Sequence, residues 1–433
     1  MATTNGVGEA AVARTIAGGP SAQYRWVILL VCWLTFVGGY MARLGLGPMA
    51  PFMKASLSLT RTQVGFFMSA VSLGQIMTLL PAGWVTDRLG VRAVISFGMI
   101  VGGVFLIAML FTHSYLMALF TMFIVGLSLG LIIPGTGTGI VFWFPAKERA
   151  MAMGIRSMAV NLGGVLSAVT LPAVCIAYGW HMGFALLGIT ALTFGILSLI
   201  LYKDPPGYRA EAGPTTVAEG AVRAPAAPAR KRESSFVVLK SRDVWLLGII
   251  GLGLSVNEFS LFSFYVLYLK EHMLLSVVAA GFVLGVVDTG GIFGKPVSGI
   301  ISDRLFNGTR KEAFIILAAT ATIFTVVIAL LPAGVPRWVL VVCSFVWGFA
   351  AVGWAGVWFT MSGEFGGKEH AGFVTGFTTA ISTLAPVLGV PVFGYLADKT
   401  GTWMWSWVYA VAMAALATVL LFFVREERKA LKV

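Results

Sequence analysis

The sequence predicts an all-α membrane protein with twelve transmembrane helices arranged as two pseudo-symmetric six-helix bundles. Composition is the first reason, because hydrophobic residues make up 58% of the 433 residues and charged residues only 11%. A soluble domain carries roughly 25% charged residues, so this chain is expected in a membrane. The second reason is a motif that occurs twice, about half a chain length apart, which indicates two related halves.

Apolar stretches define the twelve expected helices, since a transmembrane helix needs about 20 apolar residues. The N-terminal bundle (25–202) contains the expected spans 25–53, 62–83, 93–112, 115–141, 150–177 and 181–202. The C-terminal bundle (243–424) contains the expected spans 243–269, 276–300, 312–332, 337–362, 371–396 and 402–424. Residues 203–242 are rich in Pro, Ala, Arg and Glu and predict a flexible cytoplasmic linker. Residues 1–24 are expected to form a disordered cytoplasmic tail, and residues 425–433 a second tail.

The basic residues predict the orientation of these spans. With both termini and the linker inside, 22 of the 30 Lys and Arg residues lie in cytoplasmic segments and five in external ones. This asymmetry follows the positive-inside rule and explains the net charge of +12 without a nucleic-acid partner. We therefore expect a monomer in the cell (inner or plasma) membrane, with both termini cytoplasmic and the lipid bilayer as its surroundings.

The sequence lacks the signatures of an enzyme. Cys32, Cys175 and Cys343 lie in apolar stretches and do not have the spacing of a metal site or a disulfide framework. No nucleotide-binding glycine loop with its lysine is present. We expect no cofactor, no metal and no enzymatic activity.

The repeated motif predicts gating residues. Residues 83–92 read Gly-Trp-Val-Thr-Asp-Arg-Leu-Gly-Val-Arg, and residues 299–304 repeat it as Gly-Ile-Ile-Ser-Asp-Arg. An Asp at a helix end with Arg residues beyond it can pair with neighbouring helix ends and hold one state of a two-state bundle. The alternative is an ordinary basic turn. The expected gating residues are Asp87, Arg88, Arg92, Asp303, Arg304 and Lys295, the last as a gate or as a partner of Asp303.

Charged residues inside predicted spans are candidates for function, because a charge in hydrocarbon is costly. Arg43 lies in the first span, which holds no acidic residue to pair with it. Its guanidinium is a planar fork suited to a carboxylate. We expect Arg43 to bind an anionic substrate; a structural pair with an acid from another helix is the alternative. Arg156 is either a second cation in the cavity or a side chain that reaches the headgroups.

Glu258 and Asp288 are the candidate proton carriers. Each lies about midway along its predicted span. A carboxyl group in an apolar cavity holds a proton more readily than one in water, and a nearby cation opposes this effect. Competition between a proton and a cation for the carboxylate could therefore couple transport to protons. The alternative for each acid is a purely structural ion pair. With both acids ionised, the embedded charges, including those of Arg43, Arg156 and Lys295, sum to +1.

Several polar and aromatic residues are supporting candidates for substrate contact. Taken singly, each could equally serve packing or an interfacial aromatic belt. They are Tyr40, Gln75, Asn161, Tyr265, Trp354, Trp358 and Ser382.

These motifs resemble those of the major facilitator superfamily, and within it the anion:cation symporter family. Residues 40–51, with Arg43 three positions after Tyr40, resemble the first helix of those symporters and of the organophosphate:phosphate antiporters. The segment Trp-Phe-Pro-x-x-Glu-Arg at 143–149 resembles the loop after their fourth helix. The resemblance implies a twelve-helix transporter in which the first-helix arginine contacts the anion, and we carry that role to Arg43.

Two departures from these families narrow the expectation. The antiporters complete a dianion clamp with an arginine on the seventh helix, where this chain has Glu258, which argues against a phosphate ester. Many anion symporters carry an arginine and a glutamate on the fourth helix, and residues 114–141 have neither. The proton carrier is therefore expected elsewhere.

We predict a secondary transporter that moves a small organic anion, a carboxylate, by proton symport through alternating access. Proton-coupled efflux of apolar or cationic compounds is one alternative. Anion exchange, including that of small inorganic anions such as nitrate, is another. A non-transporting sensor on the same fold is a third.

Overall fold

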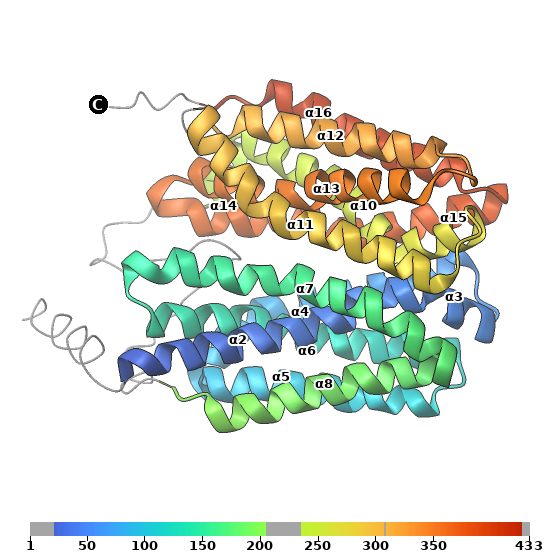
Figure 1. Ribbon diagram of the computed structural model, residues 1–433. Helices are drawn as coiled ribbons and strands as arrows, with labels where there is room; N and C mark the ends of the chain where they lie inside the picture. Colours follow the sequence, from blue (N-terminus) through green and yellow to red (C-terminus); the bar gives the residue numbers. More distant parts are fainter. Residues whose placement is uncertain (1–20, 205–234, 307–308, 427–433) are drawn as a thin grey trace, which may run out of the picture.

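The computed structural model describes residues 21–204, 235–306 and 309–426, which fold into two bundles of helices (Figure 1). The predicted N-terminal tail, most of the linker and the end of the C-terminal tail lie outside these residues. The described part contains no β-strand.

The helices follow the chain in two groups of six membrane-crossing segments. The first group is α2 (Ser21–Leu44) continued by α3 (Leu46–Ser56), α4 (Arg61–Leu89), α5 (Val91–Ala108), α6 (Tyr115–Trp143), α7 (Ala146–Tyr178) and α8 (Trp180–Leu201). The second group is α10 (Arg242–Glu271), α11 (Val277–Leu305), α12 (Lys311–Leu330), α13 (Arg337–Phe365), α14 (Gly367–Ser382) continued by α15 (Val390–Thr400), and α16 (Met404–Phe423). A π-helical turn (Ala385–Gly389) that contains Pro386 joins α14 to α15.

Length and composition suit these helices to a membrane. Among the described residues, 11 helical segments are long and apolar enough to cross one. The remaining long helix, α4, has 29 residues and packs within the first bundle against α6, which brings the number of segments to the predicted twelve. Large apolar side chains such as Phe97 (62% exposed) and Leu116 (73%) face outward, as expected for a surface covered by lipid.

The two ends of the molecule differ. We call the end where α2 begins and α16 finishes the terminal end, and the opposite end, where α3 and α15 lie, the distal end (Figure 1). At the distal end and at mid-depth the bundles meet where α3 packs on α10, α4 on α15, and α7 on α11. Nearer the terminal end, a Cβ added at Gly154 of α7 or Gly299 of α11 would meet no atom within 4 Å. The structure therefore holds the bundles together at the distal end.

Glycine lets helices within each bundle pack at backbone distance. A Cβ added at Gly348 of α13 would lie 2.0 Å from the carbonyl oxygen of Val287 on α11. In the first bundle, a Cβ at Gly126 of α6 would lie 2.1 Å from the carbonyl oxygen of Val71 on α4. Real Cβ atoms do not approach so closely, so only glycine permits these contacts. Each bundle is consequently well suited to move as a rigid body.

This packing predicts that Gly348→Ala destabilises the second bundle. The added methyl forces α11 and α13 apart, and overpacking of this kind costs about 1–3 kcal/mol. Thermal unfolding of the purified protein in detergent should show a lower midpoint. The control is Gly356→Ala on the same helix, where the nearest atom would lie at an ordinary 3.4 Å. Equal midpoints for the two variants would contradict the proposed contact.

Candidate functional site

Arg43 lies at the contact between the two bundles. It sits at the end of α2, just before the helix is interrupted at Gly45, and is only 4% exposed. Its Nη1 donates to Oε1 of Gln75 at 2.5 Å, and its Nη2 donates to Oγ of Ser72 at 3.3 Å, both on α4. Its Cζ also lies 4.8 Å from the ring centre of Phe259 on α10. Arg43 is therefore oriented by the first bundle and touches the second.

Glu258 precedes Phe259 on α10 and is partly buried. The cations that act on its carboxylate are Lys295 of α11 and Arg43 of α2, and the indole of Trp354 on α13 lies beside it. Trp354 is itself fixed, since its Nε1 donates to the carbonyl of Ala351 at 3.0 Å. Glu258 thus experiences the charge of one cation from each bundle.

A second polar group joins α7 of the first bundle to α11 of the second. The Nζ of Lys295 donates to Oδ1 of Asn161 at 2.8 Å, and Nδ2 of Asn161 donates to Oδ1 of Asp288 at 3.4 Å. Asp288 is 1% exposed, and a Cβ at Gly164 of α7 would lie 2.4 Å from its Oδ1. The absence of a side chain at Gly164 therefore makes room for this carboxylate.

The structure gives Lys295 a partner that the sequence did not suggest. The sequence suggested Asp303, eight residues further along the same helix. Asp303 instead accepts a hydrogen bond from Arg310, and Lys295 reaches across to Asn161 of the other bundle. Position along one helix could not reveal this choice, because Asn161 lies 134 residues away in sequence.

Arg156 is buried inside the first bundle, with 3% of its surface exposed. Its Nη2 donates to the carbonyl of Ile133 at 3.2 Å, and its Cζ lies 4.0 Å from the ring centre of Phe36. The ring of Tyr40 lies 5.2 Å from the same Phe36 ring. Arg156 and Tyr40 therefore both pack against Phe36 in the first bundle.

Other predicted substrate residues make their hydrogen bonds inside the second bundle. The hydroxyl of Tyr265 lies 2.7 Å from Oγ of Ser344, and Nε1 of Trp358 donates to the carbonyl of Leu247 at 2.9 Å. The Oγ of Ser382 lies 2.7 Å from that of Ser255. The described contacts of Arg43 are with other residues, namely Gln75, Ser72 and Phe259.

The structure thus gathers part of the predicted site and adds two residues to it. The gathered residues are Arg43, Gln75, Asn161, Glu258, Asp288, Lys295 and Trp354. Ser72 and Phe259 were not predicted. Ser72 lies three residues before Gln75 and therefore on the same helix face, a signal that could have found it. Phe259 carries no such signal.

Apart from Lys295, which bonds to Asn161 of the other bundle, the predicted gating residues make their described contacts within their own bundles. Arg88 lies over the ring of Trp84 at 4.0 Å, and Arg92 donates through its backbone N–H to Asp204 at 3.2 Å. Arg310 links Asp303 to Glu364: it donates to Asp303, and its Nε lies 3.8 Å from Oε1 of Glu364. Arg304 is exposed, and the side chain of Asp87 lies outside the described part.

A group of charged residues closes the distal end, and we call it the distal clasp: Lys54, Arg61 and Thr62 of the first bundle with Glu271 and Asp398 of the second. Glu271 accepts from Nζ of Lys54 at 2.5 Å and from Nη2 of Arg61 at 2.7 Å. Asp398 accepts from the backbone N–H groups of Arg61 at 3.0 Å and Thr62 at 2.8 Å. Asp398 therefore caps the first turn of α4 from the opposite bundle, where a negative charge is favoured.

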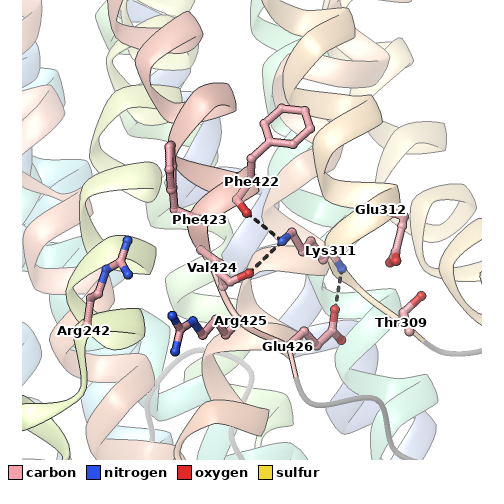
Figure 2. A pocket seen from close by; sticks show the side chains of 9 residues that line it. All are labelled: Arg242, Thr309, Lys311, Glu312, Phe422, Phe423, Val424, Arg425 and Glu426. Carbon is pink, nitrogen blue, oxygen red and sulfur yellow. Dashed lines mark hydrogen bonds between the residues drawn. The ribbon is translucent and has the colours of Figure 1, made fainter.

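A surface cavity of about 490 Å³ lies apart from these residues, at the terminal end of the second bundle (Figure 2). Its walls are the start of α10, the start of α12 and the end of α16. Lys311 donates through Nζ to the carbonyls of Phe422 and Val424 there, and through its backbone N–H to Glu426. The cavity shares no residue with the group around Arg43. Among the described residues, no cluster of His, Cys, Asp or Glu is arranged to hold a metal ion.

Comparison with known proteins places this arrangement in a family. The sequence profile described as Major Facilitator Superfamily matches residues 31–386 and 310–433. The chain is 23% identical to the hexuronate transporter of Bacillus subtilis, over 90% of this chain and 92% of the relative. It is 24% identical to a probable galactarate/D-glucarate transporter of the same organism, over 96% of this chain and 95% of the relative. It is also 28% identical to the membrane sensor protein UhpC of Salmonella typhimurium, over 88% of this chain and 85% of the relative.

Solved structures support the same fold. The chain matches two structures of a bacterial homologue of the human lysosomal transporter Spinster. Both structures are inward-facing, and one is unoccupied and the other occupied. Each match covers 93% of this chain and 97% of the Spinster homologue. The TM-scores are 0.74 and 0.75, with 17% sequence identity.

The distal clasp predicts that Asp398→Asn opens the distal end. An amide has one acceptor oxygen where the carboxylate has two, so one N–H group at the start of α4 loses its partner. A hydrogen bond to a charged group contributes about 1.5–3 kcal/mol, and the closed population should fall roughly tenfold or more relative to the open one. Electron spin resonance distances between labels at Ser56→Cys and Thr402→Cys should lengthen.

The matched control is Asp243→Asn, which removes a carboxylate that accepts from the backbone of Arg425 within the second bundle. It should leave the label distances unchanged. If Asp398→Asn also leaves them unchanged, the clasp does not hold the distal end closed.

Proposed function

The chain belongs to the major facilitator superfamily, and from this premise we propose that it is a secondary transporter that carries a small organic carboxylate across the cell (inner or plasma) membrane by proton symport. Its similarity to transporters of organic acids supports an organic anion as substrate. It is a multi-pass membrane protein of a superfamily whose members are not enzymes. The proposal goes beyond this similarity in two respects: the substrate is a carboxylate, and its transport is coupled to protons.

Arg43 is the observation on which the proposal depends. The guanidinium is 4% exposed at the contact between two apolar bundles, where the low dielectric constant strengthens its attraction for an anion. Hydrogen bonds to Gln75 and Ser72 orient the guanidinium. A carboxylate that reached Arg43 from the side of Phe259 would contact both bundles at once. Binding at such a position favours the state in which the bundles enclose the substrate.

Glu258 is the first candidate for the proton carrier. It is partly exposed, and so within reach of a proton, and the same Arg43 acts on its carboxylate. Asp288 is the second candidate, although its position against Gly164 favours a role in joining α7 to α11. Lys295 contacts Asn161 beside it and remains a candidate gate.

The difference between the two ends of the molecule supports transport by alternating access. The distribution of basic residues supports a cytoplasmic terminal end; in that orientation this conformation, closed at the distal clasp, faces inward. Transport then requires the clasp to open as the terminal ends come together. The two Asp-Arg turns, at residues 87–92 and 303–304, are positioned to hold the outward-facing state in that movement.

A sensor that binds its ligand without transporting it is a second candidate function. The 28% identity to a membrane sensor protein favours it specifically. A sensor would bind an organic acid and show no flux in liposomes. Binding and uptake measured on the same preparation separate the two.

The proposal predicts that Arg43→Lys weakens uptake and Arg43→Ala abolishes it. A lysine keeps the charge and loses the two-pronged hydrogen-bonding geometry, which should raise KM roughly 10- to 100-fold. The measurement is uptake of radiolabelled mono- and dicarboxylates and sugar acids into proteoliposomes with an imposed inward proton gradient. Arg25→Ala is the control, an arginine on the same helix that pairs with Glu148. Normal uptake by both Arg43 variants would remove Arg43 from the binding site.

A further inference from the structure

We propose that the cavity at the terminal end of the second bundle binds the phosphate of an anionic membrane lipid, held by the guanidinium groups of Arg242 and Arg425. This site is separate from the group around Arg43, and the inference does not depend on the proposed transport function. Three observations carry it: the depth of the cavity, the two arginines that line it, and the corresponding place in the first bundle.

The cavity lies where three membrane-crossing helices end. The helices α10, α12 and α16 are each long and apolar enough to cross a membrane, and the cavity is lined by the first residues of α10 and α12 and the last residues of α16. The side chains of Phe422 and Phe423 on its wall are exposed. Trp245, one turn into α10, is exposed too, as is common for Trp at the boundary between lipid tails and headgroups. The cavity therefore lies at the depth of the headgroups.

Arg242 and Arg425 are brought together in this cavity. Asp243, next to Arg242, accepts a hydrogen bond from the backbone N–H of Arg425 at 3.2 Å, which ties the start of α10 to the chain after α16. Neither guanidinium forms a hydrogen bond or an ion pair within the described part of the chain, with Asp243 or with any other residue (Figure 2). Two like charges in one cavity repel each other, and an anion shared between them replaces this repulsion by attraction.

The other charged side chains of the cavity are engaged elsewhere. Glu426 accepts from the backbone N–H groups of Arg310 and Lys311, both at 2.8 Å, and so caps the first turn of α12. The Nζ of Lys311 donates to two carbonyl groups at the end of α16. Glu312 lies on the far side of Lys311 from the two arginines (Figure 2). These contacts leave the two guanidinium groups available to an anion from outside the chain.

The first bundle uses its own side chains at the corresponding junction, between the starts of α2 and α5 and the end of α8. The hydroxyl of Tyr24 donates to the carbonyl of Leu201 at 2.5 Å, and the Nζ of Lys203 lies 5.3 Å from the centre of the Tyr24 ring. The Nε of Arg92 donates to the carbonyl of Leu199 at 2.8 Å. The cations at this junction therefore have partners within the protein, in contrast to Arg242 and Arg425.

A lipid phosphate matches the chemistry of the cavity. A guanidinium presents a planar fork of N–H donors that suits phosphate oxygens, and two arginines can hold one phosphate between them. The volume of about 490 Å³ falls within the usual range for ligand sites. Basic pockets between transmembrane helices are typical sites for anionic headgroups. A bound lipid would join the start of α10 to the chain after α16 and so stabilise this end of the bundle.

The surroundings favour a lipid over other anions. The exposed rings of Phe422 and Phe423 can contact the acyl chains of a lipid, and a free phosphate ion gains nothing from them. The chain that continues from the cavity, residues 427–433, lies outside the described part and has three basic side chains and one acidic side chain. It is therefore a poor source of the anion.

The test measures lipid binding to the purified full-length protein by native mass spectrometry during titration with phosphatidylglycerol. We expect the first phosphatidylglycerol to bind more tightly than those that follow. Arg242→Gln combined with Arg425→Gln should raise the Kd of this first lipid roughly tenfold or more, because it removes charge-assisted hydrogen bonds. Phosphatidylcholine, whose phosphate is balanced by its own choline group, should bind weakly and equally to both proteins.

The matched control is Lys270→Gln combined with Arg337→Gln, which removes two exposed cations from the distal end. It should leave the Kd of the first phosphatidylglycerol unchanged. A second measurement needs no variant: a photoreactive phosphatidylglycerol should label the segment 422–426 of the unmodified protein. Inorganic phosphate and glycerol 3-phosphate, added in excess over the lipid, should not prevent this labelling.

Three results would overturn the inference. One is equal affinity of the Arg242→Gln/Arg425→Gln variant and the unmodified protein for the first phosphatidylglycerol. Another is an equal loss of affinity in the control variant, which would indicate a general effect of charge. The third is labelling that misses residues 422–426 or that inorganic phosphate abolishes, since the cavity would then hold no lipid or a soluble phosphate. Uptake of organic acids is measured separately, so the proposed function stands or falls on its own.

Discussion

The cost of holding charged side chains between two apolar bundles governs this structure. A buried ion must be matched by a partner or by hydrogen bonds, and here several of these contacts cross to the opposite bundle. Lys295 bonds to Asn161 across the interface, and Asp288 fits against the bare backbone of Gly164. Arg43 of the first bundle lies against Phe259 of the second. Any relative movement of the bundles changes these contacts, so movement and ion binding are linked through the same few residues.

The bundles themselves are suited to such a movement. Within each, glycine brings helix backbones into direct contact, as at Gly348 and Gly126, and such contacts resist internal rearrangement. Between them, contact at the distal end depends on charge-assisted hydrogen bonds of the distal clasp. Bonds of this kind near the membrane surface can be exchanged for water at modest cost. Strong packing inside each bundle and exchangeable polar contacts between them favour rocking of whole bundles.

Much of the fold could be predicted from the sequence, because hydropathy and length suffice to locate a transmembrane helix. The span expected at 115–141 is Tyr115–Trp143, and that expected at 243–269 is Arg242–Glu271. The embedded charges were equally visible. Their partners were not, because partner choice depends on which helices pack together across more than 100 residues of sequence. Lys54 and Arg61 counted only as external charges until the structure joined them to Glu271, and nothing local marked Phe259 as the neighbour of Arg43.

Direct observation of proton movement tests the central claim most closely. Proteoliposomes in a weakly buffered medium would receive a membrane-impermeant organic acid that they accumulate, while the external pH is recorded. Symport predicts that the medium becomes more alkaline as the acid enters, in proportion to uptake, and that Arg43→Ala abolishes both signals. Uptake without any change in external pH would contradict the account. It would assign the protein to anion exchange or uniport and leave Glu258 and Asp288 as structural residues.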